Sequence, residues 1–434
     1  MTREPSRLFN RHFFLLWQGQ TISQLGGQVF NVAMLLWIKH ATGSATAMGL
    51  MLMLSALPAV LLGPIAGTFA DRRSRRGIVI ASNVFRGIAS LSLAGLMLSG
   101  ATATRTILVG LFAVSLTSAV VGAFFNPAVS AAIPELVPRE KVAAANSLSQ
   151  SSLQLSAFLG QGLGGTLFRV LGAPALFLIN GFGYLFAAAS ACFISIPQSI
   201  PPSAASWRES FAAFKRDLLR GLGYVWANAG LRTLVLVSAA LNFFTVPVVV
   251  LLPFYVEDFL KVKADWYGFI MAAYGVGSLA GYVSAGALRL SGKAGGRLNL
   301  ITLVLAQSVG FVLLGILRDP YAALALAALG GVGGGIVIVN ITTILQLTTP
   351  GEMRGRVFGL LGTIAGGLVP VAMGLSGVVA DLLNRNIPSI YVICGACTAA
   401  LAVAASLSRP FRDYLRLEGK SEIPAVEKQA VPMP

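Results

Sequence analysis

Long apolar stretches separated by short polar segments fill the sequence from residue 13 to residue 408. Each stretch approaches the length of about 20 residues that an α-helix needs to cross the hydrocarbon core of a bilayer. The pattern therefore predicts an all-α membrane protein with twelve crossing helices. These predicted helices cover residues 13–38, 47–70, 78–99, 106–125, 143–168, 174–196, 232–255, 266–288, 298–317, 321–347, 356–381 and 389–408.

The composition also indicates a membrane protein. Of 434 residues, 56% are hydrophobic and 11% are charged. A soluble domain of this length cannot remove so much apolar surface from water, because burial on folding levels off at roughly three quarters. The lipid bilayer must therefore surround much of the chain. The formal net charge of +16 could suggest a nucleic-acid partner, but the positions of the basic residues give it another explanation.

Lys and Arg residues are distributed unevenly over the segments that join the predicted helices. If the N-terminus lies in the cytoplasm, 24 of the 32 basic residues fall in cytoplasmic segments and seven fall outside. Cytoplasmic loops of membrane proteins carry this excess of positive charge. Both termini are therefore predicted to be cytoplasmic, and no nucleic-acid partner is expected. The remaining base, Arg86, lies within a predicted helix and is expected to extend its side chain toward the headgroups.

The longest internal connection divides the chain into two halves. Phe211 and Leu218 in this connection share one face of a predicted helix and basic residues lie opposite, which is typical of an amphipathic helix at a membrane surface. A Pro-x-Glu pattern begins at Pro138 and again at Pro350, 212 residues later, which indicates two parallel six-helix repeats. The predicted units are the N-terminal bundle 1–197, the cytoplasmic linker 198–231, the C-terminal bundle 232–409 and the cytoplasmic tail 410–434.

The segment 63–76, GPIAGTFADRRSRR, joins a glycine-bearing helix to a cluster of charges. Glycines four residues apart leave a helix face without bulk, so another helix can approach closely. A carboxylate at the helix end can pair with Arg or with the positive N-terminus of a neighbouring helix. We interpret these features as a gate between the halves. The residues assigned to the gate are Gly63, Gly67, Asp71, Arg72, Arg75, Arg76, Arg354, Arg356 and Asp381.

A second glycine pattern lies in the predicted helix 143–168. The sequence from residue 156 to residue 165, SAFLGQGLGG, places Gly160 and Gly164 four residues apart, with Gly165 beside them. Such a pair forms a groove for a neighbouring helix, and the resulting interface can seal one side of a transport cavity. Close helix packing without any part in gating is the alternative, because glycine pairs are common in membrane helices.

Uncharged amide side chains recur at helical spacing in two predicted helices of the first half. Amides are costly in hydrocarbon unless they find partners, so they should face the interior of the bundle. There they could line a cavity for a neutral or zwitterionic amphipathic molecule, or they could hold helices together through hydrogen bonds. The amides assigned to substrate binding, including weaker candidates in the second half, are Gln24, Gln28, Asn31, Gln150, Gln154, Asn242, Asn340 and Gln346.

No Asp or Glu lies near the middle of a predicted crossing. Because proton-coupled transporters need a protonatable group along their path, coupling to H⁺ is left open. The sequence has no ATPase-type phosphate loop and no cluster of catalytic or metal-ligating residues. We therefore expect no cofactor, no metal and no enzyme activity. A membrane enzyme or receptor that does not transport is the least favoured interpretation.

These segments resemble the major facilitator superfamily over nearly the whole chain. Residues 63–76 are similar to the superfamily's G-x-x-x-D-R-x-G-R-[RK] loop, with Ser74 in place of a Gly. Residues 156–165 are similar to the G-x-x-x-G-P-x-x-G-G motif of its exporters, with Ser156 in place of the first Gly and Gln161 in place of the Pro. Further likeness to the branch of macrolide-efflux proteins and the enterobactin exporter lies at residues 16–26, 125–128, 144–148 and 354–359.

The resemblance implies a transporter of the bacterial cytoplasmic membrane, and we expect a monomer because nothing in the sequence demands a partner chain. It would export an amphipathic small molecule, such as a macrolide-like drug or a siderophore, by alternating access. The branch commonly carries an acid after Gly26, where this chain has Gly27, so exchange of a drug against H⁺ is not implied. The neutral amides fit a second interpretation equally well, a lysophospholipid or lipid translocator of the same fold that is not proton-coupled.

Overall fold

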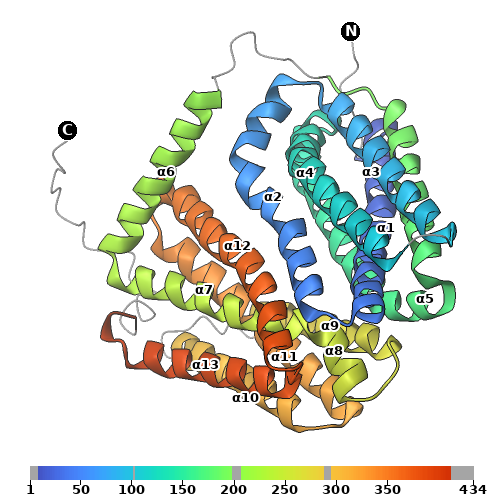
Figure 1. Ribbon diagram of the computed structural model, residues 1–434. Coiled ribbons are helices and arrows are strands. Elements are labelled where there is room, and N and C mark those ends of the chain that lie inside the picture. The colour runs from blue at the N-terminus through green and yellow to red at the C-terminus, as the bar shows by residue number, and fades with distance from the viewer. Residues whose placement is uncertain (1–7, 101–102, 198–206, 288–294, 412–434) are drawn as a thin grey trace.

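The computed structural model describes residues 8–100, 103–197, 207–287 and 295–411, which form helices joined by short turns (Figure 1). No strand occurs within these ranges. In chain order the helices are α1 (Arg11–Thr42), α2 (Ala45–Arg72), α3 (Arg75–Leu98), α4 (Thr104–Leu136), η1 (Arg139–Lys141), α5 (Val142–Cys192), α6 (Trp207–Ala227), α7 (Ala229–Val250), α8 (Leu252–Phe254), η2 (Tyr255–Phe259), α9 (Asp265–Ala287), α10 (Gly295–Ile316), α11 (Pro320–Thr348), α12 (Gly351–Leu382) and α13 (Ile387–Leu407).

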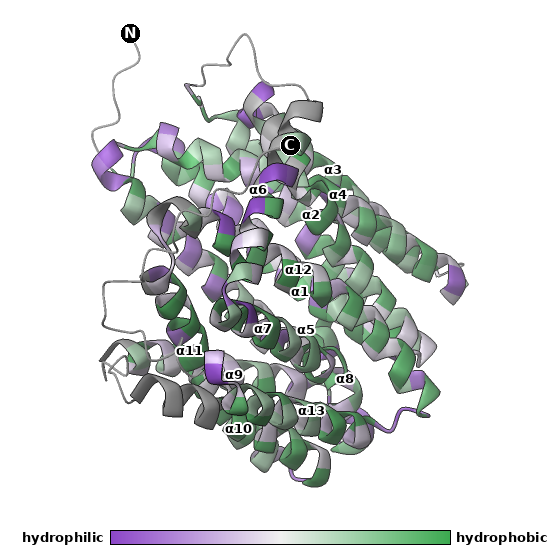
Figure 2. Cartoon of the chain, turned by 90° about the vertical axis from the view of Figure 1, so that its left-hand side faces the viewer, coloured by the Kyte–Doolittle hydropathy of each residue, from purple (hydrophilic) through white to green (hydrophobic). Residues whose placement is uncertain are grey.

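Over the described ranges, ten helices are long and apolar enough to cross a membrane, and hydrophobic residues cover most of their length (Figure 2). Two predicted crossings fall within α5, where Gly172 has a left-handed φ of 73° and Pro174 follows, so the helix is kinked there. In α10 the described apolar part is the shorter segment Val304–Ile316. The all-helical membrane class is confirmed, and the count of twelve crossings stays a prediction.

One predicted crossing, residues 232–255, is broken near its end. The α-helix α7 stops at Val250, and the chain continues through the short helix α8 into η2, a π-helical turn. Pro253 lies at the start of α8 and has no N–H to donate, so the regular helical ladder cannot run through this point. The break matters because it places Glu257 and Asp258 beside the end of α1.

Each half is built from the same kinds of helix pairs. In the first half α1 and α3 pack on α5, and α2 packs on α4. In the second half α7 packs on α12, α10 on α13, and α9 on α11. The halves meet through α2 with α12 and through α5 with α9.

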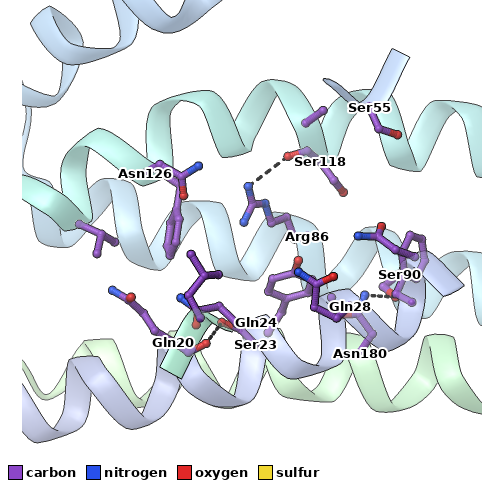
Figure 3. Close-up of a pocket in the computed structure, with 18 of the residues that line it drawn as sticks. Gln20, Ser23, Gln24, Gln28, Ser55, Arg86, Ser90, Ser118, Asn126 and Asn180 are labelled. Carbon is purple, nitrogen blue, oxygen red and sulfur yellow. Dashed lines mark hydrogen bonds between the residues drawn. The ribbon is translucent and has the colours of Figure 1, made fainter. Parts of the chain in front are cut away.

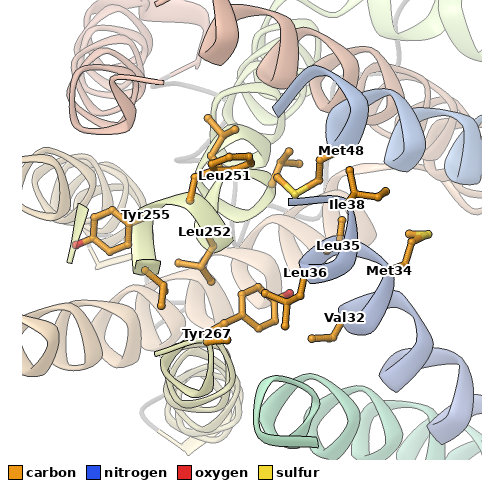
Figure 4. Packing of buried hydrophobic residues seen from close by; sticks show 14 of the residues in the cluster. Val32, Met34, Leu35, Leu36, Ile38, Met48, Leu251, Leu252, Tyr255 and Tyr267 are labelled. Atoms are coloured by element: carbon orange, nitrogen blue, oxygen red, sulfur yellow. The ribbon is translucent and has the colours of Figure 1, made fainter. Parts of the chain in front are cut away.

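Contacts between the halves concentrate at one end of the molecule, which we call the closed end and define by residues 39–46, 251–265 and 381–386. A buried apolar cluster lies beside it, and the cluster contains Val32, Leu36 and Met48 from the first half and Leu252 and Tyr267 from the second (Figure 4). Packing of these side chains against one another holds the two halves together. At the opposite, open end, defined by residues 73–76, 137–141 and 349–351, α2 and α12 diverge and α6 contacts both (Figure 1).

Candidate functional site

A polar cavity of about 630 Å³ lies inside the first half, between α1, α3, α4 and α5 (Figure 3). Amide and hydroxyl side chains form most of its wall. Among the described residues that line it, Arg86 is the single charged one. A wall of this kind can offer many hydrogen-bond donors and acceptors to a guest molecule, together with one positive charge.

The helix α1 turns one amide face toward the cavity, because Gln24, Gln28 and Asn31 recur every three or four residues and are joined there by Gln20. The Nε2 of Gln161 in α5 lies 3.4 Å from the Oε1 of Gln28, to which it donates. The Oε1 of Gln24 is buried and has no hydrogen-bond partner among the described residues. The structure therefore brings three predicted residues to one cavity, and their role in binding stays a prediction.

The helix α5 contributes Asn146 and Gln150 to the same wall. The third amide of that series, Gln154, is exposed and lies outside the cavity lining. Beyond the kink, α5 adds Asn180, whose Nδ2 donates to the hydroxyl of Ser90 in α3 at 3.2 Å. The sequence analysis did not select Asn180, because nothing in its local sequence shows that it faces α3.

The three predicted amides of the second half do not line this cavity. Asn242 is exposed and donates to the Ser238 carbonyl of its own helix at 2.9 Å, Asn340 is buried, and Gln346 is exposed. The second half holds instead an apolar cavity of about 570 Å³ between α7, α9, α10 and α11. This apolar cavity of the second half thus differs in chemistry from the polar cavity of the first half.

Arg86 is the main wall residue that the sequence analysis placed elsewhere. Its side chain was expected to reach toward the headgroups, yet it lies in the cavity wall, where Nη2 donates to the Ser118 carbonyl at 3.1 Å (Figure 3). The guanidinium carbon also lies 5.1 Å from the ring centre of Phe125 and 5.6 Å from that of Tyr184. The available signal was Ser90, one helical turn further along the same face of α3.

A cluster of charged side chains joins the two halves at the closed end. The ammonium of Lys39 at the end of α1 contacts the Glu257 carboxylate and lies 3.0 Å from Oδ1 of Asp258. His40 Nε2 lies 3.0 Å from the Glu257 carboxylate. Burial alone would raise the pKa of Glu257, but the hydrogen bonds from His40 and Lys39 outweigh it and lower that pKa. These contacts join α1 of the first half to η2 of the second.

Two further polar contacts cross between the halves at this end. Asp381, the last acid of α12, accepts hydrogen bonds from the Ser44 hydroxyl at 2.9 Å and from the Thr46 amide at 2.8 Å. A carboxylate in this position satisfies free N–H groups and complements the positive end of the α2 dipole. Arg169 pairs with Asp265 at 2.9 Å and joins α5 to α9. The assignment of Asp381 to gating is consistent with this position and stays a proposal.

The glycines predicted in α5 allow close packing on both sides. A Cβ added at Gly160 would lie 2.4 Å from Cβ of Gln28, and one at Gly164 would lie 2.8 Å from Val32. The absence of a side chain at both positions therefore lets α1 pack closely against α5. A Cβ at Gly165 would lie 2.4 Å from the Ala264 carbonyl oxygen, so this glycine admits the start of α9. Gly165 therefore belongs to the interface between the halves, and the other two belong to packing within the first half.

The predicted gate glycines have no such neighbours at the open end. A Cβ added at Gly63 or Gly67 would meet no described atom within 4 Å. The same is true of Gly359 and Gly362 in α12. In this conformation the glycine faces of α2 and α12 therefore look onto open space, whereas the sequence pattern had suggested a closely packed neighbour.

Two arginines of the gate segment contact other residues of the first half. Arg75 pairs with Glu135 of α4 and donates to the Ala131 carbonyl at 3.1 Å, and Arg76 donates to the Cys192 carbonyl. Arg72 is half-buried at the end of α2. In the second half, Nη1 of Arg356 lies 3.5 Å from the Met353 sulfur. The side chains of Asp71 and Arg354, two further gate candidates, lie outside the described residues.

A helical bundle of apolar helices, with an internal polar cavity and two halves that contact each other at one end, is typical of multi-pass membrane transporters. The profile of the family described as transmembrane secretion effector matches residues 5–429. The chain therefore belongs to this family of the major facilitator superfamily, and the resemblance to its macrolide-efflux branch is confirmed.

Relatives and solved structures agree with this assignment. Macrolide efflux protein A of Streptococcus pyogenes is 24% identical over 409 residues, covering 92% of this chain and 96% of that protein. Multidrug efflux pump Tap of Mycolicibacterium fortuitum is 25% identical over 367 residues, covering 82% and 86%. The structure of the nucleoside transporter NupG is similar in fold, with a TM-score of 0.67 at 12% identity, covering 90% of this chain and 98% of that one.

A bacterial homologue of the human lysosomal transporter Spinster, solved in an inward-facing and unoccupied conformation, has a TM-score of 0.63 at 16% identity. The match covers 94% of this chain and 96% of that one. At such identities the two structures show the fold alone. The family membership and the relatives named as efflux proteins support a transporter of the efflux type.

Proposed function

We propose that the chain is a secondary active exporter of an amphipathic small molecule, either a macrolide-like drug or a siderophore, in a bacterial cytoplasmic membrane. The main observation that supports the proposal is a polar cavity in a molecule whose two halves contact each other at the closed end. Alternating access requires a binding site that is sealed on one side while the other side is free. The relatives named as efflux proteins support the outward direction.

We further propose twelve crossings in two parallel repeats, with both termini in the cytoplasm and the protein acting as a monomer. The matching helix pairs of the two halves support the repeats, since α1 with α5 corresponds to α7 with α12, and α2 with α4 to α9 with α11. The excess of basic residues in the predicted cytoplasmic segments supports a cytoplasmic position for the open end. The conformation described here would then be an inward-facing one.

The glycines of α2 and α12 support a second conformation. Next to the closed end these two helices pack closely through glycine, because a Cβ at Gly49 would lie 2.5 Å from the Met373 carbonyl oxygen and one at Gly374 would lie 2.8 Å from the Met53 sulfur. Continuing this antiparallel register toward the open end brings Gly67 opposite Gly359. We propose that rocking of the halves separates the Gly49–Met373 contact and brings Gly67 against Gly359.

One observation favours the alternative, a lysophospholipid translocator that is not proton-coupled. The apolar cavity of the second half could hold an acyl chain, while the polar cavity of the first half held a headgroup. The described lining of the polar cavity contains no carboxylate that could carry a proton. The acids Glu257 and Asp258 lie at the closed end instead.

Flux measurements in proteoliposomes separate the two functions. Purified protein would be supplied with macrolides, siderophores and fluorescent lysolipids, with and without a pH gradient, and protein-free liposomes would be the control. Saturable movement of a drug or siderophore supports the exporter, and acceleration by the gradient adds proton exchange. Movement of lysolipid alone, indifferent to the gradient, would replace the exporter by the translocator. No movement of any compound by folded protein would contradict both.

A further inference from the structure

Arg86 occupies an unusual electrostatic position. It is a permanent cation on the wall of a cavity inside the first half, and the described lining residues around it are otherwise uncharged. No described carboxylate forms an ion pair with it. A cation withdrawn from bulk water is costly unless negative charge or hydrogen bonds replace the lost hydration. A charged residue that faces a cavity inside a membrane protein is therefore a candidate binding site for a group of opposite charge.

The surroundings hold the guanidinium toward the cavity. A Cβ added at Gly122 of α4 would lie 2.3 Å from Nη2 of Arg86, so only a glycine leaves room for the group there. The rings of Phe125 and Tyr184 lie within 6 Å of the guanidinium carbon. Nη2 uses one donor on the Ser118 carbonyl, while Nε is buried and has no acceptor among the described residues. The group is thus positioned with donors to spare.

The α1 side of the cavity also leaves space where an acid could have stood. Gly27 lines the cavity, and a Cβ added there would meet only the Tyr184 hydroxyl, at 3.5 Å. A carboxylate at this position would line the same cavity as Arg86, and both side chains would lie near Tyr184. The chain has a glycine at this point, so the positive charge stays available to a guest.

We propose that Arg86 binds an oxyanion of the transported molecule, a carboxylate or a phosphate, so that the substrate is an amphipathic anion or carries one anionic group. Guanidinium donors match these oxyanions in geometry and charge. The amides of α1 and α5 would bind the uncharged polar part. This inference rests on the proposed function, because it takes the polar cavity as the substrate site. It distinguishes this chain from a transporter selective for cationic drugs.

Binding of matched aromatic compounds tests the proposal without transport. The full-length protein, in nanodiscs of zwitterionic phosphatidylcholine, would be titrated calorimetrically with 1-naphthyl phosphate, 1-naphthoate and the cation 1-naphthylmethylammonium. We expect both anions to bind at least about tenfold more tightly than the cation, and Arg86→Met to weaken anion binding by about tenfold or more. Arg86→Lys should retain part of the affinity, because it keeps the charge and loses the planar fork.

Two further variants act through geometry and charge. Gly122→Ala should displace the guanidinium and weaken anion binding severalfold. Gly27→Asp supplies an internal carboxylate and should turn the preference toward the cation. Arg105→Met makes the same chemical change as Arg86→Met at an exposed position of α4 and should leave all three affinities unchanged.

The proposal is overturned if the wild type shows no saturable anion binding, or if Arg86→Met binds both anions within about twofold of the wild type. Should that variant not fold, unchanged anion binding in both Gly122→Ala and Gly27→Asp overturns it equally. Failure of the exporter is a separate result. If anion binding depends on Arg86 but no compound is transported, the anion site stands and export is rejected. If a drug is transported but anion binding does not depend on Arg86, export stands and the anion site is rejected.

Discussion

Lys39 has a side chain only 6% exposed, and it is tolerated because two carboxylates from the other half surround its ammonium. The two acids differ in environment, since the Glu257 side chain is 17% exposed and that of Asp258 is 46% exposed. Glu257 also contacts His40. At the scale of single residues, we therefore expect the closed end to depend more on Glu257 than on its neighbour.

Replacing Glu257 by Gln should destabilise the closed end by about 1–3 kcal/mol, because Lys39 loses its most enclosed partner. Asp258→Asn is the matched control and should cost less, since its side chain is more exposed. Double electron–electron resonance between spin labels on α1 and α9 would measure the fraction of molecules with the closed end shut. Equal effects of the two substitutions would contradict the prediction.

The pH dependence of the same measurement follows from the lowered pKa of Glu257. A carboxyl group whose folded-state pKa lies below its ordinary value of 4.5 contributes its full stabilisation above that pH. The contribution is lost as the pH falls through the lower, folded-state value. The closed fraction should therefore be insensitive to this group near neutral pH and fall in strong acid, and Glu257→Gln should lose that acid-dependent part.

At the scale of helices, the two glycine patterns have opposite surroundings. Gly160→Ala would force a methyl group against Gln28 of α1, and overpacking of this kind costs roughly 1–3 kcal/mol. Gly63→Ala meets no described atom and should leave stability unchanged or raise it by about 0.5–1 kcal/mol through helix propensity. Thermal unfolding in detergent would check both, with Gly310→Ala as a control in an equally open position. Destabilisation by Gly63→Ala matching that of Gly160→Ala would contradict the packing described here.

The sequence predicted the helices well because each crossing carries its own signal, an apolar run of sufficient length between polar ends. The break after α7 was missed, since the run from 232 to 255 stays apolar through Pro253. The amide face of α1 was predictable from local spacing. Arg86 was not, because its partners Gly122 and Tyr184 come from other helices and become neighbours only in the folded bundle.

At the scale of the whole molecule, α2 and α12 should pack against each other at one end of their interface at a time. A disulfide between Gly67→Cys and Gly359→Cys, in a background without the native cysteines, should form only when the open end shuts, and it should abolish transport. Reduction should restore transport. Cross-linking of Ser44→Cys with Asp381→Cys is the matched control at the closed end and should trap the conformation seen here. Full transport by either cross-linked protein would contradict alternating closure.

The closed end is fastened partly by charges that water can reach. Arg169, in the pair with Asp265, has a side chain 49% exposed, whereas the apolar cluster beside it is buried. Dissolved ions screen the first kind of contact, within a Debye length of about 8 Å at physiological salt, and leave the second nearly untouched. If this end faces outward, salt in the medium outside the cell should weaken the exposed ion pairs between the halves. The fraction of molecules with the closed end shut should then fall as the external salt concentration rises.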